Sequence, residues 1–148
     1  MVHLRKAGIK GSQLLRLYNV FVRPVIEFCC VVYHPLLTKG QSEDIERLQK
    51  QVIKLAFGWD LSYTDMCSIY SIPTLEERRK DYIDRFILKT IDSERFSSSW
   101  FPLRENIDQD VRDRRPFCET RARTARYFNS PLSFMKRRAN ELYIEAEA

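Results

Sequence analysis

The sequence predicts a mostly α-helical, single-domain protein, and three observations lead to that prediction. Apolar residues recur at spacings of three and four over several long segments. Helix start signals stand in front of these segments. The 148 residues include only four glycines, which disfavours Gly-rich phosphate loops and turn-dense all-β folds. With 44% hydrophobic and 30% charged residues, the chain has an ordinary globular composition and can bury a core.

The first predicted helix opens at Gly11-Ser12, with Ser12 as its N-cap, and continues to Tyr33. Pro24 lies inside this pattern and lacks a backbone N–H, so a kink or short break is expected there. Pro35 ends the segment. Since Leu17–Tyr33 is short and is interrupted by charges and proline, a membrane span is not expected.

The second predicted helix begins at Ser42, its predicted N-cap. Two acids follow in its first turn, Glu43 and Asp44, where the helix dipole favours negative charge. Its apolar stripe consists of Ile45, Leu48, Val52, Leu55 and Ala56. Gly58 is suited to end this helix, and a short helix is expected over 63–70.

A capping box, Thr74 to Glu77, predicts the start of a fourth helix that runs to about Ile91. We expect its inward side chains to be Leu75, Tyr82, Ile83, Phe86 and Ile87. Three cations, Arg78, Arg79 and Lys80, lie in the first two turns, where the helix dipole disfavours them. Either an external partner or intramolecular pairing with acids would explain their position.

Residues 93–115 break the helical pattern with Ser97–Ser99 and Pro102, and are expected to form a linker. Its apolar residues Trp100, Phe101 and Leu103 are expected to dock on the body of the protein. Ser130-Pro131 then predicts a last helix over about 131–143. The predicted organisation is a helical bundle over 1–92, a packed linker over 93–115, and a basic element over 116–148 in the same domain.

The charge distribution is compatible with a polyanionic partner, and equally with basic residues that simply solvate helix faces. Residues 1–40 have a net charge of +5, residues 41–110 of −4 and residues 111–148 of +4. Residues 112–138 contain nine Lys/Arg and two acids, interleaved with aromatic residues. Guanidinium groups bind phosphates bidentately and rings stack on bases, which predicts contact with the backbone of RNA or DNA. The alternative is a solvated surface over an aromatic core. The predicted contact residues are Arg112, Arg114, Arg115, Arg121, Arg123, Arg126, Lys136, Arg137 and Arg138.

Catalytic and metal-binding patterns are weak in this sequence. The four cysteines, Cys29, Cys30, Cys67 and Cys118, do not resemble a disulfide framework, so reduced thiols and an intracellular location (nucleus or cytoplasm) are expected. Cys30 and His34 have a spacing that allows a shared metal, but a packed thiol beside a histidine in a turn is favoured. We expect no cofactor, no metal site and no enzymatic activity.

The order of several short motifs resembles one family. The chain is similar to the region C-terminal to the palm in animal non-LTR (LINE-type) retrotransposon reverse transcriptases. The motifs that carry this resemblance are Leu4–Ile9, Leu17-Tyr18, Arg23–Phe28, Tyr33–Pro35, Ile45–Lys50, Ser62–Thr64, Ile72–Arg79 and Thr124–Ser130. They extend over nearly the whole chain.

The resemblance implies a helical, thumb-like bundle that grips a template–primer duplex beside a palm. The family's catalytic Tyr-x-Asp-Asp motif does not occur in this sequence, and its metal-binding carboxylates are the basis of nucleotidyl transfer. The expected protein is therefore a non-catalytic relic of such an enzyme that binds nucleic acid. The alternatives are a helical protein-interaction module, and a thumb that acts only with a separate palm.

A thumb in a complete enzyme buries one side against the palm. In a chain that acts alone, this side would be exposed or would bind a new partner. We expect a two-fold homodimer through the first helix. The residues predicted for this contact are Leu14, Tyr18, Val22, Ile26 and Cys29.

Overall fold

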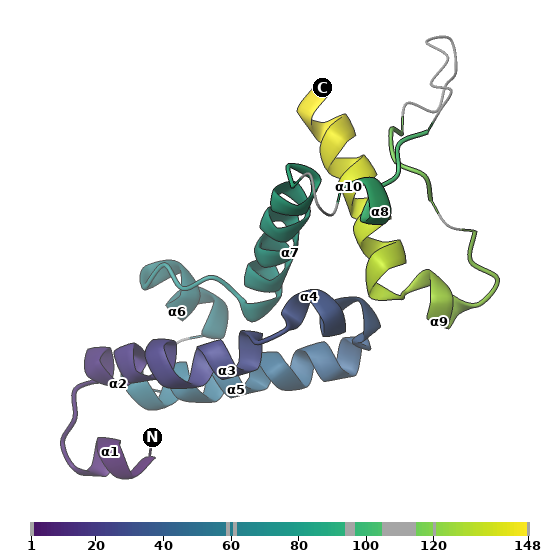
Figure 1. Cartoon of the computed structure of the whole chain (residues 1–148). Coiled ribbons are helices and arrows are strands. Elements are labelled where there is room, and N and C mark those ends of the chain that lie inside the picture. Colours follow the sequence, from purple (N-terminus) through teal and green to yellow (C-terminus); the bar gives the residue numbers. More distant parts are fainter. Residues whose placement is uncertain are drawn as a thin grey trace. The chain divides into compact units, whose positions relative to one another are not determined.

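The computed structural model describes residues 2–58, 60, 62–93, 97–104, 115–119 and 121–147. These residues are mostly helical, as predicted (Figure 1). Within them, β-pairing is confined to one isolated antiparallel bridge between Leu103 and Phe117. No helix in the described ranges combines the length and the apolar content that crossing a bilayer requires.

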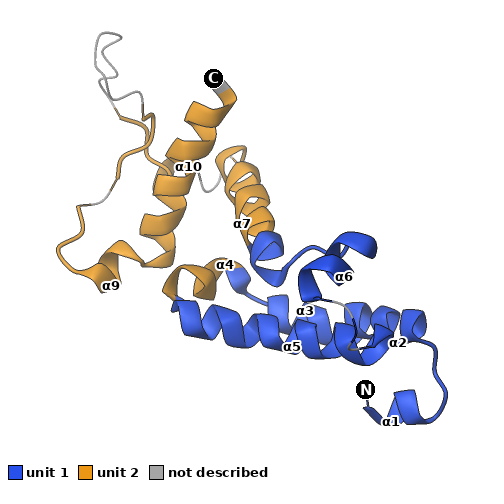
Figure 2. Ribbon diagram, turned by 180° about the vertical axis from the view of Figure 1, so that it is seen from behind, with its two compact units in different colours: residues 1–30, 37–79 blue, residues 31–36, 80–148 orange. Residues whose placement is uncertain are grey.

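The chain divides into two compact units, coloured separately in Figure 2. Unit 1 contains residues 1–30 and 37–79, and unit 2 contains residues 31–36 and 80–148. This division differs from the predicted bundle over 1–92. The predicted fourth helix does not belong to one body, because its first residues pack in unit 1 and its later ones in unit 2.

Unit 1 begins with α1 (Val2–Lys6), which the sequence did not predict, followed by α2 (Gly11–Leu17). The N-cap of α2 is Lys10, so the predicted cap at Ser12 is wrong. The side chain of Gln13, three residues after Lys10, accepts a hydrogen bond from the Lys10 N–H at 3.2 Å. The helix therefore begins one residue before the predicted cap.

The helix is not broken at Pro24, where a kink or short break was predicted; a π-helical segment precedes the proline instead. The chain continues from α2 through a π-helical segment, η1 (Tyr18–Val22), into α3 (Arg23–Glu27). The Arg23 N–H donates to the carbonyl of Tyr18, five residues earlier. This wider turn places Pro24 at the start of α3, where a missing N–H is tolerated. The break comes later, at Cys29, which adopts a left-handed φ of 55°.

After α4 (Cys30–Tyr33) and the 3-10 turn η2 (His34–Leu36), the long helix α5 spans Lys39–Phe57. Its N-cap is Thr38, whose hydroxyl accepts from the Gln41 N–H at 3.3 Å while Gln41 Oε1 accepts from the Thr38 N–H at 3.0 Å. The predicted cap at Ser42 is therefore wrong by one helical turn. Gly58 ends the helix as predicted, with φ 111°.

The core of unit 1 lies where α2 packs on α5, side by side in both ribbon views (Figures 1 and 2). Tyr18 of η1 joins it by donating to Gln49 of α5 at 3.1 Å. The predicted short helix is present as α6 (Tyr63–Ile69) and adds Met66 to this core. The fully or almost fully buried apolar side chains of unit 1 are Leu14, Tyr18, Cys30, Ile53, Ala56, Met66, Ile72 and Leu75.

The helix α7 spans Leu75–Ile91, as predicted, and begins at the predicted capping box. The Thr74 N–H donates to Glu77 at 2.9 Å, and the Glu77 N–H donates to the Thr74 hydroxyl at 3.2 Å. Arg78 pairs with Glu27, and the fully buried Arg79 donates to Ser42 Oγ at 2.8 Å. For Arg78, the explanation by intramolecular pairing with an acid is confirmed, whereas the bond from Arg79 to Ser42 goes to a hydroxyl.

The core of unit 2 is formed by Ile83, Ile87, Phe101, Phe117, Met135 and Ala139. Phe101, just after α8 (Ser97–Trp100), docks as predicted, whereas Leu103 is 65% exposed and does not. Phe86 is also more exposed than predicted, at 37%. The last helices are α9 (Ala125–Phe128) and α10 (Pro131–Glu147), of which α10 is longer than predicted.

Candidate nucleic-acid interface

The short segment around α9 brings several of the predicted contact residues to the surface of unit 2. Thr124 caps α9, and its hydroxyl accepts a hydrogen bond from the Tyr127 N–H at 3.2 Å. Three arginines of this segment are exposed: Arg121, Arg123 and Arg126. Beside them, the rings of Tyr127 and Phe128 are 47% and 49% exposed.

Arg137 connects this segment to α10. Its Nη1 donates to the carbonyl of Phe128 at 2.7 Å, and its guanidinium carbon lies 3.6 Å from the centroid of the Phe128 ring. Stacking of a guanidinium on a ring leaves its other N–H groups able to donate. We call the set Arg121, Arg123, Arg126, Tyr127, Phe128 and Arg137 the α9 cluster.

No acid among the described residues neutralises the positive charge of the α9 cluster. Within the described part of the chain, no carboxylate forms an ion pair with Arg121, Arg123 or Arg126. Exposed, unneutralised arginines attract a polyanion, and exposed rings beside them offer stacking surfaces for bases.

Arg138 has a different environment from the α9 cluster. Its guanidinium donates two hydrogen bonds of 2.9 Å to Asp84 and further bonds to Glu141 at 3.0 Å and Glu145 at 3.1 Å. The hydrogen bonds to Asp84 are the main cause that raises the pKa of Arg138 above its ordinary value. This arginine holds α7 and α10 together within unit 2, which leaves little of its charge for an external phosphate.

Two further predicted residues are also less available to a phosphate. Lys136 is only 8% exposed. The side chain of Arg115 is 41% exposed, but it donates to Glu119 at 3.0 Å. We therefore leave Arg115, Lys136 and Arg138 out of the candidate interface. Arg112 and Arg114 lie outside the described residues.

The structure adds a second basic surface that the sequence analysis did not single out. His3, Arg5 and Lys6 in α1, together with Lys10, are all exposed on unit 1. The signal in the sequence was the density of basic residues before Gly11. No Phe, Tyr or Trp occurs among residues 2–10, so this surface offers only the His3 ring in place of the Tyr127 and Phe128 rings of the α9 cluster.

The predicted homodimer face is partly wrong. Leu14 and Tyr18 have 0% exposure because they pack inside unit 1. Val22 and Ile26 are half-buried, and only Cys29 is exposed. The opposite face of the same helical segment is the apolar one at the surface. Its large exposed side chains are Val20, Phe21, Val25 and Phe28, with exposures of 58%, 67%, 74% and 75%.

The residues considered for metal binding are dispersed. Among the described residues, no three His, Cys, Asp or Glu side chains gather closely enough to hold a metal ion. Cys30 is buried, and His34 packs edge-on against the Phe134 ring at 6.0 Å. None of the four cysteines, all within the described ranges, is in a disulfide.

Comparisons of the chain with protein-family models, with curated proteins and with solved structures gave no match. The function is therefore inferred from the geometry of the α9 cluster, from the exposed apolar face and from the motif order of the sequence.

Proposed function

We propose that this protein is a non-catalytic nucleic-acid-binding protein, derived from a retrotransposon reverse transcriptase, that contacts RNA or DNA through the α9 cluster. One observation carries the proposal. Arg121, Arg123 and Arg126 are exposed within six residues of each other, form no ion pair with any described acid, and lie beside two half-exposed rings.

The chemistry of these side chains suits a phosphate backbone. Each guanidinium presents planar N–H donors that match two phosphate oxygens, and Tyr127 and Phe128 offer faces on which unpaired bases stack. Phosphate contacts fix position but do not read sequence, so binding should be weakly sequence-specific. Because bound cations displace counterions from the nucleic acid, affinity should fall with salt.

The motif order supports the reverse-transcriptase ancestry. The matching region of that family lies beside the template–primer duplex, which makes a retained grip on nucleic acid the simplest function. An alternative within the same ancestry is that the chain acts as a thumb only with a separate palm. In that case the isolated protein would bind a duplex weakly, and a palm added in trans would strengthen the binding.

The test is a set of fluorescence-anisotropy titrations with RNA, duplex DNA and an RNA–DNA hybrid at two salt concentrations. The variant R121A/R123A/R126A should bind more weakly and should lower the salt slope by about 2 to 3, since each phosphate contact contributes about 0.9 to that slope.

The matched control is R5A/K6A/K10A, which removes the same number of positive charges from the α1 surface. It should leave affinity and slope nearly unchanged. If both variants lost affinity equally, binding would depend on overall positive charge and not on the α9 cluster. If the salt slope of R121A/R123A/R126A were unchanged, the α9 cluster would be excluded as the contact surface.

A second candidate function is a helical protein-interaction module, favoured by the exposed apolar face of η1 and α3. Burial of apolar surface is nearly insensitive to moderate salt, whereas binding through phosphates is not. Retention on heparin and elution with salt therefore distinguish the two functions. The two surfaces lie on different units, so one chain has the means for both.

A further inference from the structure

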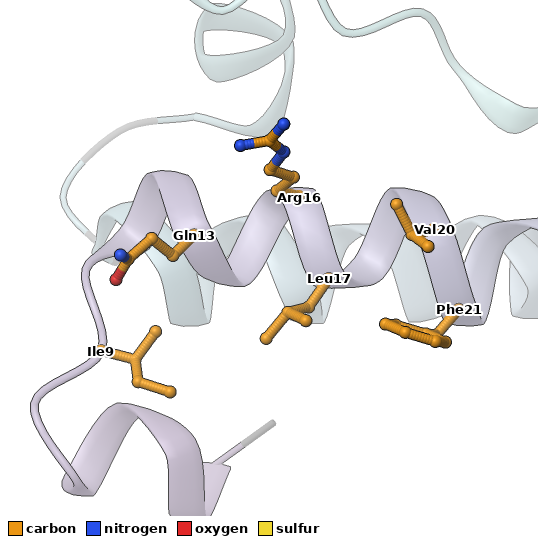
Figure 3. A pocket seen from close by; sticks show the side chains of 6 residues that line it. All are labelled: Ile9, Gln13, Arg16, Leu17, Val20 and Phe21. Atoms are coloured by element: carbon orange, nitrogen blue, oxygen red, sulfur yellow. The ribbon is translucent and has the colours of Figure 1, made fainter.

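An apolar stripe runs along the surface of unit 1, on the segment that joins α2, η1 and α3. Its members are Leu17, Val20, Phe21, Pro24, Val25 and Phe28. Near its start, Leu17, Val20 and Phe21 line a groove together with Ile9, Gln13 and Arg16, as Figure 3 shows. All members of the stripe except the partly buried Leu17 are exposed.

The stripe is comparable in area to the largest apolar patch of a typical monomer, which is often functional. From their exposed fractions, Val20, Phe21, Val25 and Phe28 together present about 500 Å² of surface. Two copies of the stripe would bury about 1,000 Å² in total, which is the lower range for a specific interface.

The positions of the stripe are symmetric about one point of the helix. Its members form three pairs that share one centre, midway between residues 22 and 23: 17 with 28, 20 with 25, and 21 with 24. If two copies cross antiparallel at that point, Leu17 meets Phe28 of the other copy, Val20 meets Val25, and Phe21 meets Pro24. A two-fold interface requires this kind of self-complementary patch.

Charge is consistent with such a pairing. No member of the stripe is charged, and the two charged residues within 17–28 lie off it: Glu27 pairs with Arg78 inside unit 1, and Arg23 is half-buried. An antiparallel arrangement also places the N-terminal end of each helix beside the C-terminal end of the other, which the helix dipoles favour.

We infer that this apolar stripe is a self-association surface, occupied by the same stripe of a second copy in an antiparallel, two-fold dimer. This inference specifies the partner and the register for the interaction module given above as a second candidate function. It is independent of nucleic-acid binding by the α9 cluster. Because the contact is small, the dimer should form at micromolar concentration.

Sedimentation equilibrium over the micromolar range tests the association. The weight-average mass of the wild-type protein should rise from 17.7 kDa toward twice that value. Phe21→Ser and Val25→Asp, made separately, should each shift the midpoint by at least tenfold to higher concentration. The matched control is Ile69→Asp, because Ile69 is 61% exposed on α6, away from the stripe. Circular dichroism should show all three variants folded, since these side chains are at the surface.

Cysteine cross-linking tests the register, in a Cys29→Ser background that removes the exposed thiol near the stripe. A 1:1 mixture of Leu17→Cys and Phe28→Cys proteins should give a covalent dimer under mild oxidation. Each variant alone should not, because the identical positions would lie about 16 Å apart along the helix axis.

A wild-type monomer at all concentrations would overturn the inference, as would Phe21→Ser and Val25→Asp proteins that dimerise like the control. Cross-links within a single variant but not in the mixture, or no cross-link at all, would overturn the antiparallel register. If the wild-type protein binds RNA or DNA but does not dimerise, the proposal for the stripe has failed. If it dimerises but does not bind RNA or DNA, the proposal for the α9 cluster has failed.

Discussion

Asn140 pairs with the backbone of Phe117 through both ends of its amide. Its Oδ1 accepts from the Phe117 N–H at 2.9 Å, and its Nδ2 donates to the Phe117 carbonyl at 3.2 Å. Both residues are buried, with exposures of 2% and 7%. The Asn140 side chain on α10 therefore provides hydrogen-bond partners for both backbone groups of Phe117, as a neighbouring strand would.

Replacement of Asn140 by alanine should destabilise the protein. Two buried backbone groups would lose their partners, and each loss costs about 1 to 3 kcal/mol, so the free energy of unfolding should fall by at least about 2 kcal/mol. Urea denaturation measures it. The control is Asn129→Ala at an exposed asparagine, for which a change below about 0.5 kcal/mol is expected. Similar losses in both variants would contradict the structural role of this amide.

A second prediction concerns the contact between α2 and α5 at Gly11. A Cβ atom at this position would lie 2.1 Å from the Ala56 carbonyl oxygen, closer than any van der Waals contact. Gly11→Ala should therefore lower the free energy of unfolding by about 1 to 3 kcal/mol, because backbone has to move.

Gly40 is the matched control for Gly11. It is also near the start of a helix, but a Cβ there meets nothing within 4 Å. Gly40→Ala should stabilise the protein by up to about 1 kcal/mol through higher helix propensity. Thermal and urea denaturation of both variants measure the two effects, and destabilisation by Gly40→Ala would contradict the open space seen at that site.

Local signals account for the elements that the sequence predicted well. The capping box at Thr74 and the glycine at Gly58 act through contacts within one helical turn, and both operate as expected. The start of α5 was missed for a local reason. Thr38 and Gln41 also form a capping box, but Ser42, followed by Glu43 and Asp44, offers a competing start signal one turn later.

The face that the first helix buries was not predictable from periodicity. Both sides of residues 14–28 carry large apolar side chains, so spacing alone could not decide which one faces inward. Packing on α5 buries Leu14 and Tyr18 and leaves Phe21 and Val25 at the surface. This choice depends on tertiary contacts with residues more than thirty positions away.

The candidate site was predictable as a region but not residue by residue. Basic density along 112–138 indicated where cations gather. Which of them remain available depends on acids far away in the sequence, as with Asp84, which lies 54 positions before its partner Arg138. The residues next to Arg138 in the sequence contain no local sign of that pairing.

Two tyrosines of unit 1, the buried Tyr18 and the partly buried Tyr63, should make stability depend on alkaline pH. The Tyr18 hydroxyl donates to Gln49 at 3.1 Å, and burial raises its pKa to about 12 from an ordinary 10.0. Burial, followed by its hydrogen bond to Glu46, also raises the pKa of Tyr63. Both groups release a proton more readily in the unfolded chain, so the stability they contribute is complete below pH 10.0 and is lost as pH rises toward the folded pKa.

The expected slope is about 1.4 kcal/mol of unfolding free energy per pH unit above 10 for each tyrosine. Urea denaturation on either side of this pH measures it. Tyr18→Phe removes one of the two contributions, so its slope should be shallower than that of the wild type. At neutral pH the same variant should cost about 1 kcal/mol for the lost hydrogen bond. Equal slopes in wild type and variant would show that Tyr18 does not titrate at a raised pKa.

Alanine substitutions of Arg138 and Arg126 should have opposite effects: the first should lower stability, and the second should weaken nucleic-acid binding. Arg138→Ala removes four charge-assisted hydrogen bonds and leaves Asp84 without this cation. Since the side chains of Arg138 and Asp84 are 27% and 25% exposed, screening limits the loss to about 1 to 2 kcal/mol of unfolding free energy. Arg126→Ala, at an exposed position with no described ion pair, should change stability by less than about 0.5 kcal/mol.

Affinity for RNA or DNA should show the opposite order. Arg126→Ala should weaken binding several-fold and lower the salt slope by about 0.9, whereas Arg138→Ala should leave both unchanged while the protein is folded. Urea denaturation and anisotropy titrations on the same preparations give the two quantities together. If Arg138→Ala weakened binding as much as Arg126→Ala without loss of stability, its guanidinium would have to leave Asp84 for a phosphate. The candidate interface would then extend from α9 along α10.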